Sequence, residues 1–196
     1  MATAGVYMDK WETLGETEVT KGKIFTYLKK KAKSPDSGKI GDFDVLNFAD
    51  WVNVVAITDD QEIILVRQYR VGNDLVTLEI PGGAVDLGED DHKLALIREL
   101  QEETGYRADC VTELGPLFPN PAFMSNIITT YLATGCKKVS AQNLDHLEEI
   151  EVVTYPISEI KGLIKSGEIK HSLIVAALYL FELHSWELKK RRNFIK

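Results

Sequence analysis

The sequence predicts a mixed α/β fold, in which one mixed β-sheet packs against helices and a small β region precedes it. Short stretches rich in β-branched and aromatic residues recur along the chain, and two stretches have helical spacing. These elements follow one another without the regular strand–helix–strand alternation of a parallel sheet. Of the 196 residues, 44% are hydrophobic and 27% are charged, which provides a sizeable core and excludes disordered and disulfide-dense proteins.

The first elements form a small β region over residues 1–49. Residues 24–28 and 43–46 have the composition of strands, and the run Ser-Pro-Asp-Ser-Gly at 34–38 is a turn signal. Such a hairpin is too small to fold alone, so we expect it to lean on the main domain or on a second subunit. Lys29, Lys30, Lys31 and Lys33 beside the turn are interpreted as a solvated strand edge, with a phosphate-attracting patch as the alternative.

Residues 50–196 are expected to form the main domain. Strands are predicted at 52–57 and 62–68, joined by a turn, and then at 76–80. A helix over 91–104 is expected to end at Gly105, which suits the left-handed position after a helix. Strands at 111–118 and 127–133, a polar loop at 137–149 and a strand at 151–155 follow. Ser158 is expected to cap a short helix ending near 166–167, before a longer helix over 171–189.

The helix over 91–104 carries a cluster of carboxylates. At about 100° per residue, Glu99, Glu102 and Glu103 share an arc of about 100°. Leu94, Ile97 and Leu100 lie opposite and are expected to pack into the core, while Ala95 on the acidic side leaves room for a ligand. Like charges at this spacing repel, and a hard cation such as Mg²⁺, with Mn²⁺ as the alternative, would relieve the repulsion. The other interpretation is a solvated acidic face in which Arg98 pairs with Glu102.

With the turn before it, this helix resembles the signature of the Nudix hydrolases. The nine matching positions are Gly83, Glu89, Arg98, Glu99, Leu100, Glu102, Glu103, Gly105 and Tyr106. Eight residues separate Glu89 from Arg98, where the signature has seven. The extra residue falls near 90–92 at the helix start, where a loop can absorb it, and it leaves the role of Glu89 open.

The resemblance implies an α/β/α sandwich that cleaves a nucleoside diphosphate linked to another group. By that resemblance Glu99 and Glu103 ligate Mg²⁺, together with the carbonyl of Gly82, and Glu102 acts directly or through water. Arg98 belongs to the same catalytic signature.

The resemblance extends to the ADP-ribose and nucleotide-sugar pyrophosphatase branch. The run Leu-Val-Arg-Gln-Tyr-Arg at 65–70, the run Leu-Glu-Ile-Pro-Gly-Gly at 78–83 and Pro121, sixteen residues past Gly105, all fit it. The branch often has Pro-Gly and an acidic residue where this chain has Pro-Ala-Phe-Met-Ser-Asn at 121–126, which leaves the substrate open. The early hairpin resembles the region that commonly builds a homodimer in the branch.

The candidate substrate-binding residues are Arg70, Glu79, Gly83 and Phe123. Arg70 suits a bidentate phosphate donor, with a surface salt bridge as the alternative. Glu79 would hold either the substrate or a loop. A proton acceptor for the attacking water is expected from the loop at 137–149 by resemblance to the branch. Within it we choose Glu148 over Glu149, because Glu148 shares the parity of the inward-facing Ile150 and Val152. A solvated acidic loop, or a base at Glu102, is the alternative.

Charge, apolar stretches and cysteine content limit the kinds of partner and the cellular location that we expect. Lys and Arg number 23 and Asp and Glu 30, a net charge of −7, which argues against nucleic acid as a partner. The longest apolar stretch, 173–180, is too short to span a membrane, and the first ten residues do not resemble a signal peptide. Two cysteines without a pairing or zinc pattern predict a cytoplasmic protein.

The predicted activity is therefore Mg²⁺-dependent hydrolysis of ADP-ribose or a related nucleotide sugar. Alternatives are the same chemistry on a dinucleoside polyphosphate, a nucleoside triphosphate or an RNA cap, and a nucleotide-sugar sensor without turnover. The chain keeps all three glutamates of the signature, which a sensor could lose, and has no basic helix-turn-helix stretch.

Overall fold

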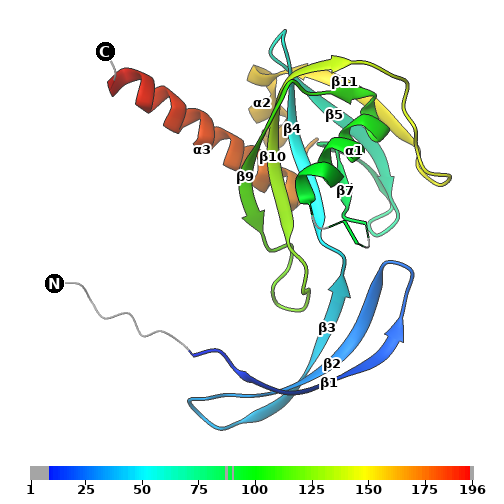
Figure 1. The fold of residues 1–196 in the computed structure, drawn as a ribbon, viewed down its shortest axis with the longest axis vertical. Coiled ribbons are helices and arrows are strands. Elements are labelled where there is room, and N and C mark those ends of the chain that lie inside the picture. The colour runs from blue at the N-terminus through cyan, green and yellow to red at the C-terminus, as the bar shows by residue number, and fades with distance from the viewer. Residues whose placement is uncertain (1–8, 87, 90, 195–196) are drawn as a thin grey trace. The chain divides into compact units, whose positions relative to one another are not determined.

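The computed structural model describes residues 9–86, 88–89 and 91–194, apart from the side chains of 189 and 191–194. Contacts divide it into two compact units (Figure 1). One comprises Met1–Ala49 and Pro119–Asn126, and the other comprises Asp50–Phe118 and Ile127–Lys196. Each unit is described by itself below.

The first unit is built on a three-stranded antiparallel sheet of β1 (Glu12–Lys21), β2 (Phe25–Lys33) and β3 (Ile40–Phe48), with β2 in the centre. The interpretation of the lysines as a strand edge is therefore wrong. Lys29 pairs with Asp44 of β3 at 2.5 Å, and Lys30 pairs with Glu16 of β1 at 2.9 Å. The sequence analysis missed β1 because every one of its residues is exposed, so no apolar alternation marks it.

Residues 119–126 complete this unit by running beside β3. The backbone N–H of Leu46 donates to the carbonyl of Phe123 at 2.7 Å, and the N–H of Ser125 donates to the carbonyl of Leu46 at 3.2 Å. The Ser125 hydroxyl also lies 2.6 Å from Asn47 Oδ1. These bonds fix a segment between two predicted strands for which the sequence predicts no element.

The second unit contains a mixed sheet. Its strands are β4 (Trp51–Thr58), β5 (Glu62–Arg70), β6 (Leu75–Glu79), β7 (Gly82–Ala84), β8 (Tyr106–Arg107), β9 (Cys110–Leu117), β10 (Ile128–Lys138) and β11 (Ile150–Pro156). The order is β11-β5-β4-β10-β8, with β6 on β5, β7 on β4 and β9 on β10. Only the pairing of β4 with β10 is parallel among these strands, so the predicted mixed sheet is confirmed.

Helices cover both faces of this sheet, which makes the unit an α/β/α sandwich (Figure 1). Helix α1 (His92–Thr104) packs on alternate residues of β4, including Val54, and α2 (Ile160–Ser166) and α3 (Ser172–Phe194) pack on the others, including Val55. Burial on both faces explains the continuous apolar run of β4. Ser158 lies inside the 3-10 turn η1 (Ile157–Glu159) and forms no cap, so that expectation is wrong. Among the described helices, none is long and apolar enough to cross a membrane.

Candidate functional site

Helix α1 is bounded by the N-cap residue Asp91, which was expected as the first helical residue, and by Gly105, which ends the helix as expected. The Asp91 side chain accepts hydrogen bonds from the N–H groups of Lys93 and Leu94, which otherwise lack partners in the first turn. Gly105 ends the helix in the left-handed conformation with φ 74°, and its N–H bonds the carbonyl of Gln101. The predicted bounds of this helix are therefore confirmed to within one residue.

The face of α1 that meets the sheet differs from the expected one. Leu94 and Ile97 are 58% and 37% exposed, whereas Ala95 is fully buried, so Ala95 leaves no room for a ligand. The buried face consists of Ala95, Leu96, Leu100, Glu103 and Thr104. The expectation is confirmed for Leu100, which is 2% exposed, and is wrong for Leu94, Ile97 and Ala95. The apolar residues of α1 do not form one stripe, so the sheet meets a face on which Leu96 and Leu100 lie beside small and polar side chains. One carboxylate of the cluster, Glu103, thereby becomes part of the interior.

Glu103 is held against the turn that precedes the helix. The backbone N–H of Gly82 donates to Glu103 Oε2 at 2.9 Å. Burial raises the pKa of the Glu103 carboxyl to about 8, and the charges of Glu99 and Glu148 act in the same direction. The Gly82 N–H and Arg70 oppose this rise without cancelling it. The site therefore contains a buried carboxylate whose charge is only partly compensated.

Glu99 lies directly on the backbone of Gly83. A Cβ atom at position 83 would be 2.5 Å from the Glu99 carboxyl carbon, so only glycine fits there with Glu99 in this position. Burial raises the pKa of Glu99, as do Glu102 and Glu148, while Arg98 lowers it. Gly82 is packed more tightly still, because a Cβ there would be 2.3 Å from the carbonyl oxygen of Val52.

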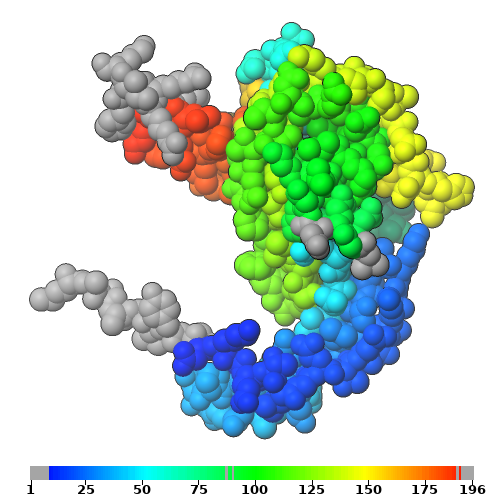
Figure 2. Space-filling model, viewed as in Figure 1, coloured from blue at the N-terminus to red at the C-terminus, as the bar shows by residue number. Residues whose placement is uncertain are grey.

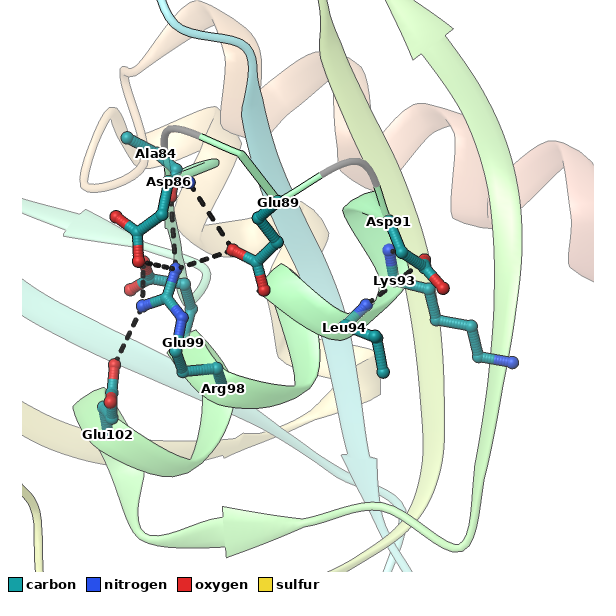
Figure 3. Close-up of polar contacts among 9 residues, drawn as sticks. All are labelled: Ala84, Asp86, Glu89, Asp91, Lys93, Leu94, Arg98, Glu99 and Glu102. Carbon is teal, nitrogen blue, oxygen red and sulfur yellow. Dashed lines mark hydrogen bonds and ion pairs between the residues drawn. The ribbon is translucent and has the colours of Figure 1, made fainter.

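Arg98 is the centre of an ion-pair cluster that Figure 3 shows in detail. Its guanidinium lies 2.9 Å from Glu99, 3.0 Å from Glu102 and 3.4 Å from each of Glu89 and Asp86. Burial acts to lower the pKa of Arg98, but these carboxylates outweigh it and raise the pKa. Arg98 therefore neutralises the outer carboxylates of the cluster and leaves Glu103 outside its reach.

The extra residue before α1 does not separate Glu89 from the cluster. Glu89 reaches Arg98, and its carboxylate also accepts the N–H of Asp86 at 3.5 Å. Asp90 lies outside the described residues, while Asp91 is the helix cap. Sequence reasoning left Glu89 open and missed Asp86, because contacts to a loop of this kind have no periodic signal in the sequence.

Arg70 and Glu79 form a bidentate ion pair across β5 and β6. Arg70 Nε donates to Glu79 Oε1 at 2.9 Å and a terminal nitrogen donates to Oε2 at 2.7 Å. The Glu79 side chain is 3% exposed and that of Arg70 is 43% exposed. Burial would raise the pKa of Glu79, but Arg70 outweighs it and the pKa is lowered. One edge of the guanidinium thus bonds Glu79, while the exposed part of the Arg70 side chain is still open to a ligand.

The loop between β10 and β11 carries Glu148. Its carboxylate raises the pKa of both Glu99 and Glu103, so it lies within electrostatic reach of them. Here the carboxylate accepts the N–H of Asp145 at 3.2 Å, while Glu149 is exposed. Phe123 belongs to the first unit and is 42% exposed.

The donor atoms on this face suit a hard divalent cation. Within the described residues, no three acidic, histidine or cysteine side chains form a ready ligand group, and Arg98 bonds both Glu99 and Glu102. The fit depends on chemistry. Carboxylate oxygens are the ligands that Mg²⁺ and Mn²⁺ prefer, and among the described residues no Lys, Arg or His side chain is in ion-pair contact with the buried Glu103 carboxyl, whose charged form burial disfavours. The site therefore fits a divalent metal.

Comparison with known proteins gives consistent results. The NUDIX domain model matches residues 48–178. The chain is 28% identical to an ADP-ribose pyrophosphatase of Bacillus subtilis (strain 168), with 88% of this chain and 92% of that protein covered. It is 31% identical to a methanol dehydrogenase activator of Bacillus methanolicus, with 88% of this chain and 92% of that protein covered. A crystal structure of an ADP compounds hydrolase superposes with a TM-score of 0.79 at 24% identity, covering 95% of this chain and 98% of that one, and shows a shared fold.

Proposed function

Because this chain belongs to the NUDIX domain family, we propose that its acidic site hydrolyses the pyrophosphate bond of ADP-ribose. The chain is a hydrolase that acts on phosphorus anhydrides of nucleoside diphosphate sugars, and the products are a nucleoside monophosphate and a sugar phosphate. The observation that carries the proposal is the carboxylate cluster of α1, seated on the glycine pair that precedes it. The preference for ADP-ribose is supported by the relative from Bacillus subtilis.

We propose Mg²⁺ as the metal, with Mn²⁺ as the alternative. Glu99, Glu102, Glu103 and the Gly82 carbonyl would hold it. When bound, the metal would neutralise charge on the phosphates and lower the pKa of a bound water. Arg98 would keep Glu99 and Glu102 in place, as its contacts of 2.9 and 3.0 Å indicate.

Glu148 is the proposed proton acceptor for the attacking water. Two observations support this role. The charge of Glu148 raises the pKa of both Glu99 and Glu103. Glu148 also lies on a loop, and a base on a loop can close over bound substrate. To act, its carboxylate must leave the N–H of Asp145. Glu149 and Glu102 are the alternatives.

Four residues are proposed to bind substrate: Arg70, Glu79, Gly83 and Phe123. Arg70 would bind a phosphate with the part of its guanidinium that Glu79 does not occupy, and the buried Glu79 would hold it in that orientation. Gly83 would let the substrate approach the backbone. Phe123, which is partly exposed, would contact the nucleotide.

Substrate assays with a matched control test this function. Release of phosphate by a coupled phosphatase is measured for ADP-ribose, GDP-mannose, dinucleoside polyphosphates and nucleoside triphosphates, with Mg²⁺ and with chelator. We expect ADP-ribose to be hydrolysed fastest and only with metal. Faster turnover of a polyphosphate would assign another substrate class, and tight binding without turnover would indicate a sensor.

We propose a homodimer built through the first unit. Its single-layer sheet leaves several large apolar residues exposed, and they are Trp11, Leu14, Val19, Ile24, Ile40 and Phe43. A three-stranded sheet of this kind gains stability by covering such a surface. Light scattering at tens of micromolar should give the mass of a dimer, and a fully active monomer would contradict this.

We also propose that the protein works in the cytoplasm. Cys110 and Cys136 are both free thiols, which is typical of a reducing compartment. Fractionation of cells should find the protein with cytoplasmic markers. The acidic net charge of −7 argues against nucleic acid as a partner.

A further inference from the structure

The first part of the β10–β11 loop caps the C-terminal end of α1. We call residues 139–143 the strap. The N–H groups of Val139 and Ser140 donate to the carbonyl of Gly105 at 2.8 and 3.2 Å, and the N–H of Asn143 donates to the carbonyl of Glu102 at 2.9 Å. Carbonyls at a helix end lack partners within the helix, so each bond satisfies a group that would otherwise need water.

Besides these hydrogen bonds, the backbone of the strap packs closely against Gly105 at the end of α1. A Cβ atom at Gly105 would be 2.2 Å from the carbonyl oxygen of Ser140. Glycine at this position therefore serves both the left-handed conformation and the approach of the strap. The strap lies at the C-terminal end of α1, and Figure 2 shows yellow-green atoms packed against green ones in the second unit.

Gln142 makes two side-chain bonds that join the strap to two other elements. Its Nε2 donates to the carbonyl of Glu103 on α1 at 2.6 Å and to the carbonyl of Ile150 at the start of β11 at 3.0 Å. An amide nitrogen has two N–H groups, and here both are used. One side chain thus connects the metal-binding helix to the strand that follows the loop.

These bonds divide the loop into a fixed and a free part. Residues 139–143 are bonded to α1, and Ile150 is bonded to Gln142 and paired with Gln68 in the sheet. Between these anchors, the hydrogen bonds that residues 144–149 make within the described part of the chain are local: the N–H of Asp145 donates to the Glu148 carboxylate, and the N–H of Glu148 donates to the carbonyl of Asp145. The free part is the part that carries Glu148.

We infer that Gln142 is a positioning residue that anchors both ends of the 144–149 segment and so limits where Glu148 can move over the metal site. The inference rests on the proposed role of Glu148. Because Gln142 Nε2 bonds the carbonyls of both Glu103 and Ile150, it ties the two ends of the six-residue segment 144–149 to each other. A segment whose ends are held at a fixed separation has fewer conformations, so less entropy is lost when Glu148 takes its working position.

Variants at Gln142 test this with two independent measurements. Gln142→Met keeps the length of the side chain and removes both donors, while Gln142→Lys keeps N–H donors at similar reach. Asn143→Ala is the matched control, because Asn143 bonds α1 through its backbone. Hydrogen exchange of the backbone amides at 139, 140 and 143 is measured in the full-length protein, and kcat and KM are measured with ADP-ribose and Mg²⁺.

We expect Gln142→Met to accelerate exchange of the strap amides and to lower kcat about tenfold, with KM changed less than about twofold. Gln142→Lys should restore most of the loss, and Asn143→Ala should stay near wild type. In the Glu148→Gln background, Gln142→Met should lower kcat by less than about twofold, because coupled residues are not additive. A purely structural role would instead give the same loss in both backgrounds.

The outcomes separate this inference from the proposed function. Unchanged exchange in Gln142→Met, or a full tenfold loss in the Glu148→Gln background, would overturn the role of Gln142 while hydrolysis by the wild type stands. If Glu148→Gln keeps the wild-type kcat, the loop carries no base and the inference fails with that assignment. If the wild type hydrolyses no nucleotide sugar, the proposed function fails, and the claim that Gln142 limits Glu148 fails with it.

Discussion

The backbone N–H of Gly82 donates to the carboxylate of Glu103 at 2.9 Å, so the turn before α1 and the last turn of the helix are directly joined. This bond aligns the two elements that carry the proposed metal ligands. It also explains why Glu103 is tolerated in the interior, since a buried carboxylate needs a donor. The following predictions start from this contact and its neighbours.

Replacing each of the two glycines by alanine should have different effects. In Gly82→Ala the new Cβ would meet backbone of β4 at 2.3 Å, so we expect a loss of stability of about 2 kcal/mol or more. In Gly83→Ala the three atoms nearest to the new Cβ would all belong to the Glu99 carboxylate, which can rotate away, so activity should fall at least about tenfold with stability nearly kept. Thermal unfolding and kcat check both, with Gly72→Ala, where nothing lies within 4 Å, as control.

Neutralising the carboxylates proposed as metal ligands should abolish turnover without unfolding the protein. Glu99→Gln and Glu103→Gln should each lower kcat at least about 100-fold at limiting Mg²⁺. Glu103→Gln should be as stable as the wild type or more so in chelator, because the amide oxygen still accepts the Gly82 N–H and no charge is buried. Glu113→Gln, at an exposed glutamate of β9, is the control. Near-normal kcat in both variants would refute the metal assignment.

Loss of the proposed base should affect kcat and leave binding intact. Glu148→Gln should lower kcat by about 10²–10⁴-fold with little change in KM, because a general base acts in the chemical step. Glu149→Gln, next in the chain and exposed, should have a milder effect. If both variants stay within about threefold of the wild type, the base lies elsewhere, with Glu102 as the first candidate.

Breaking the Arg70–Glu79 pair from one side should cost more than replacing both partners. Arg70→Met leaves the 3% exposed Glu79 side chain without its cation, so we expect a loss of about 2–4 kcal/mol in the free energy of unfolding. Adding Glu79→Gln should recover most of that loss, because no unpaired charge is then buried. Urea unfolding of the two single variants and the double variant checks this, and purely additive losses would contradict it.

Stability at high pH should depend on Cys136, which is 3% exposed. Burial raises the pKa of its thiol from the ordinary 9.0 to about 11, so the folded state keeps a proton that the unfolded state releases. This contribution is present below pH 9 and is lost as the pH rises toward 11. The difference in unfolding free energy between wild type and Cys136→Ala should therefore narrow by about 1–2 kcal/mol between pH 8 and 10.5. Cys110→Ala controls for removal of a thiol, and a constant difference would contradict this.

The sequence by itself determined the elements that depend on local chemistry. Gly105 ends α1 as expected, since a left-handed glycine acts within one turn. Asp91, expected as the first helical residue, is the N-cap one position before it. The β-branched and apolar composition of residues 52–57 predicted a strand there, and β4 (Trp51–Thr58) confirms it. The nine positions from Gly83 to Tyr106 carry the resemblance to the family signature, and the match over residues 48–178 confirms the family.

Only the tertiary structure decided which way those elements face and what they meet. The helical spacing of Leu94 and Ile97 predicted a buried stripe, yet both are exposed, because the sheet contacts the side of α1 that carries Ala95 and Glu103. The β1 strand has no apolar alternation, and its backbone hydrogen bonds to β2 hold it in place. Formation of β1 therefore depends on the partner strand, and the pattern of its own residues does not reveal it. The bonds of Gln142 to Glu103 and Ile150 likewise join residues from separate elements. Periodicity describes one element at a time, whereas burial and pairing depend on the surface that each element meets.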